Sequence, residues 1–246
     1  MALQEELTKQ GNFLFKHRSY LPLIILIVGL AVFIDTQIKA LNQSNVSMFE
    51  SYTYLCLTTS LIGLFIRVIT VGHSARRTSG RSTHKGQTAD TLNKTGMYSL
   101  VRHPLYVGNF FMWLGVALLT ENTWFIIAFI FFFMLYYERI MYAEEAFLRT
   151  KFKTQYLDWS KEVPAVVPSF KNYKKNSNPF NLKKVLRNEK NGLVALLLLF
   201  WLFECVRTCL QEKQLVLRLN WWFYAALLGI LLYGLLKVLE KKNHLD

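Results

Sequence analysis

A cationic turn and a pair of acids are the residues of this chain whose types and spacing could do chemistry. The turn, Arg102-His103-Pro104, stands at the start of an apolar segment, and Glu144-Glu145 follows the next apolar segment. Proline suits the first turn of a helix, so Arg102 and His103 are expected beside free backbone N–H groups that favour anions. Carboxylates instead accept hydrogen bonds from ammonium and hydroxyl groups. A ligand that carries both kinds of group would suit the two spots together.

Six apolar segments must position these residues. They cover residues 20–38, 51–71, 105–120, 124–141, 192–207 and 220–238. A helix needs ~20 apolar residues to cross a membrane, and most of these segments are about that long, although 105–120 is short. Only a few residues join the third segment to the fourth, so these two are expected to fold back as a helical hairpin. The hairpin brings the cationic turn and the paired acids to one face of the membrane.

The fourth segment is expected to extend beyond the membrane. It shows no helix breaker between Trp124 and about Lys153. A helix over residues 124–150 would be ~40 Å long, about 10 Å more than the hydrocarbon core. Its last turns, which carry Glu144 and Glu145, are therefore expected to project into water.

The charge distribution predicts the orientation. Hydrophobic residues make up 52% of the chain, yet its formal net charge is +13. With six crossings and a cytoplasmic N-terminus, 25 of the 29 Lys and Arg residues face the cytoplasm, as the positive-inside rule favours. Both termini are then cytoplasmic, and Arg67, near the end of its segment, is expected to reach the headgroups. Topology and attraction to anionic membrane lipids explain the basic excess, so no nucleic-acid partner is expected.

We divide the chain into three parts. Residues 1–49 are expected to form an anchor helix and an outer loop, residues 50–170 a core with the chemical residues, and residues 171–246 a basic linker and a C-terminal helical hairpin. The start of the chain has no signal-peptide pattern, so the first apolar segment is expected to remain as an anchor. The three cysteines lie in or beside apolar segments without the ligand set of a metal site, and no metal is expected.

S-adenosylmethionine has the groups that this constellation would bind. Its carboxylate suits an arginine, its ammonium and ribose hydroxyls suit carboxylates, and its sulfonium suits aromatic faces. Many nucleotides would satisfy most of the same contacts. Each residue also has a purely structural explanation: Arg102 as a membrane anchor, His103 as a polar residue at a helix start, the acids as a solvated helix end that pairs with Arg149. The tyrosines that could bind a ring or a cation could equally form an interfacial belt: Tyr98, Tyr106, Tyr137 and Tyr142.

A longer pattern surrounds these residues. Gly96-x-Tyr98-x-x-x-Arg102-His103-Pro104-x-Tyr106-x-Gly108 precedes the hairpin, and Glu144-Glu145-x-x-Leu148-x-x-x-Phe152-x-x-x-Tyr156 and Pro164-x-x-x-Pro168 follow it. The pattern resembles the isoprenylcysteine carboxyl methyltransferase and phospholipid methyltransferase superfamily of integral membrane methyltransferases, over about residues 50–170. The resemblance fits the all-α, polytopic membrane protein with about six transmembrane helices that the apolar segments predict. It also implies a cytosol-facing pocket for S-adenosylmethionine and a lipid acceptor that enters from the membrane.

The resemblance further implies individual roles. Tyr98, His103, Leu105 and Tyr106 would line the cofactor pocket, and Glu144 and Glu145 would hold the polar groups of the cofactor. Arg102 would bind an anionic group of cofactor or acceptor, which makes Arg102 and His103 the catalytic candidates.

The acceptor is expected to be a lipid or lipidated carboxylate, phosphate or amine. An anionic acceptor needs no general base, whereas an amine would need His103 or Glu145 to take a proton. The membrane, bacterial inner membrane or endoplasmic reticulum, and the oligomeric state are left open by the sequence.

Two other functions fit part of the pattern. A membrane sterol or enone reductase that uses NADPH carries a similar Arg-His-Pro segment, but its Lys-Tyr-Gly-x-x-Trp stretch is only partly matched between Phe152 and Trp159. A non-enzymatic membrane scaffold with the same fold would transfer no methyl group. The cofactor that raises the melting temperature in detergent distinguishes the methyltransferase from the reductase.

Overall fold

The computed structural model describes residues 2–18, 20–42, 49–75 and 89–242. Every regular element in these ranges is a helix, which confirms the predicted all-α class. The helices are α1 (Leu3–His17), α2 (Leu21–Asn42), α3 (Phe49–His73), α4 (Met97–Leu100), α5 (Pro104–Leu118), α6 (Thr123–Glu162), α7 (Leu182–Glu212) and α8 (Trp221–Lys241).

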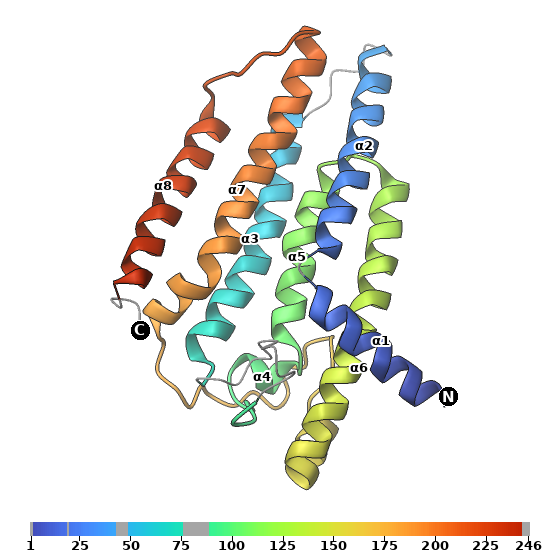
Figure 1. Ribbon diagram of the computed structural model, residues 1–246, viewed down its shortest axis with the longest axis vertical. Helices are drawn as coiled ribbons and strands as arrows, with labels where there is room; N and C mark the ends of the chain where they lie inside the picture. Colours follow the sequence, from blue (N-terminus) through green and yellow to red (C-terminus); the bar gives the residue numbers. More distant parts are fainter. Residues whose placement is uncertain (1, 19, 43–48, 76–88, 243–246) are drawn as a thin grey trace.

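Long apolar helices form the body of the molecule. Among the described residues, α2, α3, α6, α7 and α8 are long and apolar enough to cross a membrane. α5 is apolar but has 15 residues, fewer than the ~20 that a straight crossing needs, so the number of crossings stays a prediction. Figure 1 shows these six helices running roughly along one direction, with the start of α1 and the end of α8 near the end of the bundle where α4 lies. The chain is thus a polytopic membrane protein.

Small residues hold α5 tightly against α3. A Cβ at Gly63 would collide with the backbone of Gly108, and a Cβ at Gly115 would collide with Ser60. The Ser60 hydroxyl donates to the backbone oxygen of Met112 at 2.9 Å. Because lipid does not drive membrane helices together as water would, such close backbone contact is a main source of their association. It fixes the start of α5, where the cationic turn stands.

The hairpin of α5 and α6 is present, and α6 is long. Asn122 caps α6, its Oδ1 accepting from the backbone N of Phe125 at 2.9 Å. From Thr123 to Phe152 α6 is a continuous helix ~45 Å long, about 15 Å more than the hydrocarbon core, so its last turns before Lys153 extend beyond the membrane-spanning part as predicted. The helix is interrupted at Lys153 (φ 46°, ψ −122°) and then continues to Glu162.

The N-terminal residues, for which the sequence predicted no element, form α1 across the middle of α6. A Cβ at Gly11 would collide with the backbone oxygen of Arg139, so the two helices touch at that point. The Tyr136 hydroxyl donates to the backbone oxygen of Leu14 at 3.3 Å. Figure 1 shows α1 lying at a steep angle to α2 and beside the lower half of α6.

The prediction for Arg67 is wrong. We expected its side chain to reach the headgroups, but it turns into the bundle and pairs with Glu189 of α7. This is possible because α7 begins at Leu182, ten residues before the predicted segment, and its first turns carry Glu189 in a buried position.

Candidate active site

The cationic turn and the paired acids meet in the structure. Arg102 Nε lies 2.9 Å from Glu145 Oε1, and His103 Nε2 lies 2.9 Å from the same oxygen. Arg102 and His103 stand at the start of α5, and Glu145 lies on α6 where that helix passes beside this point. The convergence that we predicted from the short hairpin is therefore confirmed.

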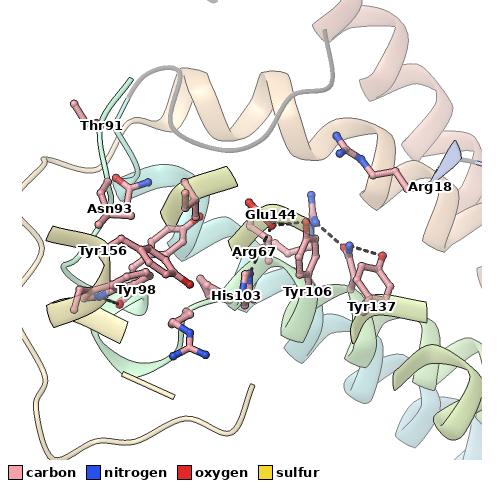
Figure 2. A pocket seen from close by; sticks show the side chains of 17 residues that line it. Arg18, Arg67, Thr91, Asn93, Tyr98, His103, Tyr106, Tyr137, Glu144 and Tyr156 are labelled. Carbon is pink, nitrogen blue, oxygen red and sulfur yellow. Dashed lines mark hydrogen bonds and ion pairs between the residues drawn. The ribbon is translucent and has the colours of Figure 1, made fainter. Parts of the chain in front are cut away.

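Glu144 lies on the other side of the imidazole. Its Oε2 accepts a 2.8 Å hydrogen bond from the Tyr106 hydroxyl and lies 3.6 Å from His103 Nδ1. The rings of His103 and Tyr106 stack with their centroids 5.5 Å apart. Figure 2 shows Glu144, His103 and Tyr106 together, with Tyr98 and Tyr156 to the left and Tyr137 to the right. His103 is thus held at both ring nitrogens and on one ring face.

Two opposing effects act on the pKa of His103. Burial of the imidazole penalises its charged form and lowers the pKa, whereas the hydrogen bonds and charges of Glu144 and Glu145 raise it. The carboxylates prevail, so the pKa of His103 lies above its ordinary value of 6.5. The site therefore favours the protonated ring, which donates from Nε2 to Glu145 and lies with Nδ1 within ion-pair distance of Glu144.

Arg102 fastens the end of α6 to the start of α5. Its Nη1 donates to the backbone oxygens of Ser160 at 2.8 Å and Val163 at 3.1 Å. The backbone N of Arg102 also donates to the oxygen of Pro164 at 2.8 Å. These bonds satisfy carbonyl groups that a helix end leaves without intrahelical partners. Binding of a ligand anion by Arg102, which the resemblance implied, stays a prediction, since Nε and Nη1 already have protein partners.

A polar cavity of about 220 Å³ opens beside this cluster. Glu145 faces Arg102 and His103 and does not line it, and neither does Tyr142. The cavity is lined by six of the predicted site residues: Tyr98, Arg102, His103, Leu105, Tyr106 and Glu144.

Further residues line the same cavity although the sequence gave them no site role. Asn93 precedes α4, and Arg18 follows α1, so two segments outside the predicted hairpin contribute. Tyr156 and Trp159 come from the part of α6 after Lys153, and their rings lie 5.8 Å apart. Trp159 Nε1 donates to the backbone oxygen of Tyr98 at 3.2 Å, which ties this aromatic wall to α4. Burial raises the pKa of the Tyr98 hydroxyl, which keeps it neutral.

An apolar groove of about 480 Å³ adjoins the polar cavity. Val107, Phe110 and Phe111 line it from α5, Met134 and Met141 from α6, and Val166 to Pro168 from the segment after α6. Three residues line both spaces and form their common wall: His103, Tyr106 and Tyr137. The two spaces therefore differ in polarity and meet at one place.

A second charged network reaches the cavity from the opposite side. Arg67 of α3 donates to both carboxylate oxygens of Glu189, at 2.7 and 2.8 Å. Its Nη1 donates to Asn109 Oδ1 at 2.6 Å, and Asn109 Nδ2 donates to the Tyr137 hydroxyl at 3.1 Å. An arginine interrupting an apolar helix was the sequence signal for this network, because ionisable residues in such helices face the bundle interior.

The part of the chain that matches known proteins contains the cationic turn and the paired acids. Residues 53–155 match the model of the phospholipid methyltransferase family. The chain is 29% identical over 108 residues to the protein-S-isoprenylcysteine O-methyltransferase of Saccharomyces cerevisiae, covering 44% of this chain and 45% of that protein. It is 32% identical over 79 residues to the enzyme of the same name from Tribolium castaneum, covering 32% and 28% of the two chains.

A third relative has a different name. The cobalt-zinc-cadmium resistance protein CzcN of Cupriavidus metallidurans is 30% identical over 123 residues, 50% of this chain and 54% of that protein. No group of three or more His, Cys, Asp or Glu side chains that could hold a metal ion occurs in the described parts of the chain. No solved structure matches the chain.

The matched region coincides with the helices that build the site. It runs from α3 through α4 and α5 into α6 and includes the cationic turn and both acids. The chain spans about half the length of the curated relatives it matches, or less. Residues 53–155 are therefore similar to the superfamily of isoprenylcysteine carboxyl and phospholipid methyltransferases.

Proposed function

We propose that this chain transfers a methyl group from S-adenosylmethionine to a lipid or lipidated acceptor in the membrane. One observation carries the proposal: His103, Tyr106 and Tyr137 are shared by a polar cavity and an apolar groove. A charged cofactor and a lipid need compartments of opposite polarity, and group transfer needs their reacting atoms to meet at one point. The common wall is such a point.

The residues of the polar cavity fit this cofactor. The Glu144 carboxylate suits the ammonium group or the ribose hydroxyls, and the arginines Arg18, Arg67 and Arg102 suit the carboxylate. The aromatic rings that line the cavity suit the adenine and the sulfonium. When bound, the cofactor supplies a methyl group on a positively charged sulfur.

The residues of the chain would align the reactants and exclude water. The protonated ring of His103 has no lone pair to accept a proton, and Glu145 Oε1 already accepts from Arg102 Nε and His103 Nε2, which makes this carboxylate a weaker base. This favours an acceptor that is already anionic, a carboxylate or a phosphate, because such a group needs no general base. Catalysis would then come from alignment in a dry site.

The test is incubation of the purified protein with methyl-labelled S-adenosylmethionine and total membranes, followed by chemical identification of the labelled product. We expect a labelled lipid or lipidated species. Release of the label as methanol by mild base would indicate a carboxylate methyl ester, whereas a base-stable product would be a phosphate ester or a methylamine, which the chemical identification distinguishes. Failure to label any lipid, together with a rise in melting temperature on adding NADPH and none on adding S-adenosylmethionine, would contradict the proposal and favour a reductase.

The distribution of Lys and Arg residues along the chain supports a cytoplasmic location for the proposed reaction. The site lies at the end of the bundle where both described chain ends lie, which is the side that the Lys and Arg residues predict to be cytoplasmic. We therefore propose an integral membrane enzyme, in the bacterial inner membrane or the endoplasmic reticulum, that takes its soluble cofactor from the cytosol and its acceptor from the lipid.

A further inference from the structure

We propose that α7 takes part in the reaction through Glu189, which positions the Tyr137 hydroxyl as a hydrogen-bond donor where the polar cavity meets the apolar groove. The inference rests on the proposed function and adds to it. The helix concerned lies outside residues 53–155, so the family match assigns it no role.

The network crosses four helices in three steps. Glu189 of α7 binds Arg67 of α3 with two hydrogen bonds, Arg67 binds Asn109 of α5, and Asn109 binds Tyr137 of α6. The side chain of Glu189 is 5% exposed and that of Arg67 is 21% exposed, so water competes little for these bonds. Figure 2 shows the last two steps as dashed lines from Arg67 to Tyr137.

The chemistry of the groups fixes the direction of every bond. A guanidinium can only donate, so Asn109 must present its oxygen to Arg67 and its nitrogen to Tyr137. The Tyr137 oxygen therefore accepts, and its own proton remains to be donated elsewhere. The nearest rings around Tyr137 are those of Tyr106, Phe133 and Tyr136, and ring faces are weak acceptors. The proton is thus available to the common wall that Tyr137 helps to form.

The packing of α5 makes room for this network. Asn109 follows Gly108, the last glycine of the motif, and a Cβ at Gly108 would collide with the side chain of Arg67. Any larger residue would push the guanidinium away from Asn109. The side chain of Arg67 lies against α5 at Gly108, and this contact explains why the motif has a glycine there.

Stability alone does not explain the ion pair. The desolvation of two buried charges offsets most of their attraction, so apolar residues of similar size stabilise a bundle as well or better. Orientation of a polar group is the role that such a pair can fill and an apolar pair cannot. A donor at the common wall would bind an oxygen of the acceptor and hold it in line with the methyl group.

The experiment measures the methyl-transfer rate of the full chain with saturating S-adenosylmethionine and a total membrane lipid extract. The variants are Tyr137→Phe, Asn109→Leu, Glu189→Gln and the double variant of Tyr137 and Glu189. Cofactor affinity by calorimetry and the melting temperature are measured on the same samples. Glu240→Gln is the control, because it removes another ion pair of α7, the 2.7 Å contact with Lys190, without touching the network.

We expect Tyr137→Phe to lower the rate about tenfold, since one hydrogen bond in the transition state is lost. Asn109→Leu should lower it similarly, because it interrupts the network and leaves the ion pair of Arg67 in place. Glu189→Gln should lower the rate less, and the double variant should be no slower than Tyr137→Phe. Cofactor affinity should stay unchanged in Tyr137→Phe, and Glu240→Gln should transfer at the wild-type rate.

The outcomes separate the two proposals. A wild-type rate for Tyr137→Phe, or effects of Tyr137 and Glu189 that multiply in the double variant, would overturn the role of α7 and leave the proposed function standing. If Glu189→Gln does not fold, Asn109→Leu decides by the same comparison with Tyr137→Phe. A wild-type protein that binds S-adenosylmethionine but methylates nothing would overturn the proposed function and this inference with it.

Discussion

Two arginine–glutamate pairs flank the polar cavity, and they connect different parts of the chain. Arg102 and Glu145 both belong to the family-matched segment and join the start of α5 to α6. Arg67 belongs to that segment too, but its partner Glu189 lies on α7, beyond it. The first pair shares its carboxylate with His103, and the second passes its orientation on to Tyr137. On the proposed function, the family-matched segment builds the cofactor side of the site and α7, which lies outside that segment, orients the acceptor side.

The largest effect is expected from breaking the first pair. Glu145→Ala leaves Arg102 and His103 without their common partner, at a cost on the order of 2 kcal/mol of folding stability, because a hydrogen bond to a charged group is lost. We expect the displaced Arg102 and His103 to abolish S-adenosylmethionine binding while the protein remains folded. Calorimetry measures the binding, with Glu162→Ala at an exposed ion pair as the control. Unchanged binding in Glu145→Ala would contradict its role.

A smaller effect is expected at the neighbouring acid, which lines the cavity itself. Glu144→Gln can still accept the hydrogen bond of Tyr106 but loses the negative charge that suits the cofactor. A charge-assisted hydrogen bond contributes ~1.5–3 kcal/mol, so the dissociation constant of S-adenosylmethionine should rise about 10- to 100-fold. The melting temperature without cofactor should fall slightly, because the attraction between Glu144 and the protonated His103 ring is also lost. Equal affinity in the variant and the wild type would show that Glu144 does not touch the cofactor.

The packing around the second pair, Arg67 and Glu189, can be disturbed without changing the charge of either residue. Gly108→Ala places a methyl group against the Arg67 side chain and should cost ~1–3 kcal/mol of stability through overpacking. Gly234→Ala is the matched control, because no atom lies within 4 Å of its added Cβ. Thermal unfolding in detergent compares the two. Equal melting temperatures of the two variants would mean that α3 and α5 can move apart without loss of stability. The side chain of Arg67 would then have room to move aside.

The smallest effect is a dependence of stability on pH. The folded-state pKa of His103 lies above 6.5, so its ion pairs contribute fully below about pH 6.5, the unfolded pKa, and are lost as the pH rises through the folded value. The melting temperature of the wild type should therefore fall toward that of His103→Gln as the pH is raised from 6 to 9. A constant difference between the two proteins over this range would indicate that His103 does not change protonation there.

The sequence predicted that the residues of the first pair meet at one face of the membrane, although not that they pair with each other, because local rules determine this convergence. A proline at a helix start, a connection of a few residues and a long uninterrupted helix leave one arrangement for Arg102, His103 and Glu145. The second pair could not be predicted, because 122 residues separate Arg67 from Glu189. The facing of α7 toward α3 depends on packing among several helices, and apolar composition alone does not specify how a membrane helix is rotated.

Two other features also escaped prediction. The helix α1 is polar enough to be read as a cytoplasmic tail, and only its contact with α6 near Gly11 explains its position. The interruption of α6 at Lys153 follows from no property of lysine. Its consequence is that Tyr156 and Trp159 reach the polar cavity.

The most direct test of the account is to block the apolar groove while leaving the polar cavity intact. Met134→Trp fills the groove from α6, and Phe131→Trp enlarges an exposed apolar residue of the same helix that does not line the groove. We predict that Met134→Trp binds S-adenosylmethionine with wild-type affinity but transfers its methyl group to membrane lipids at least tenfold more slowly, whereas Phe131→Trp does both at wild-type levels. Full transfer by Met134→Trp, or loss of cofactor binding in it, would contradict two compartments that meet at His103, Tyr106 and Tyr137.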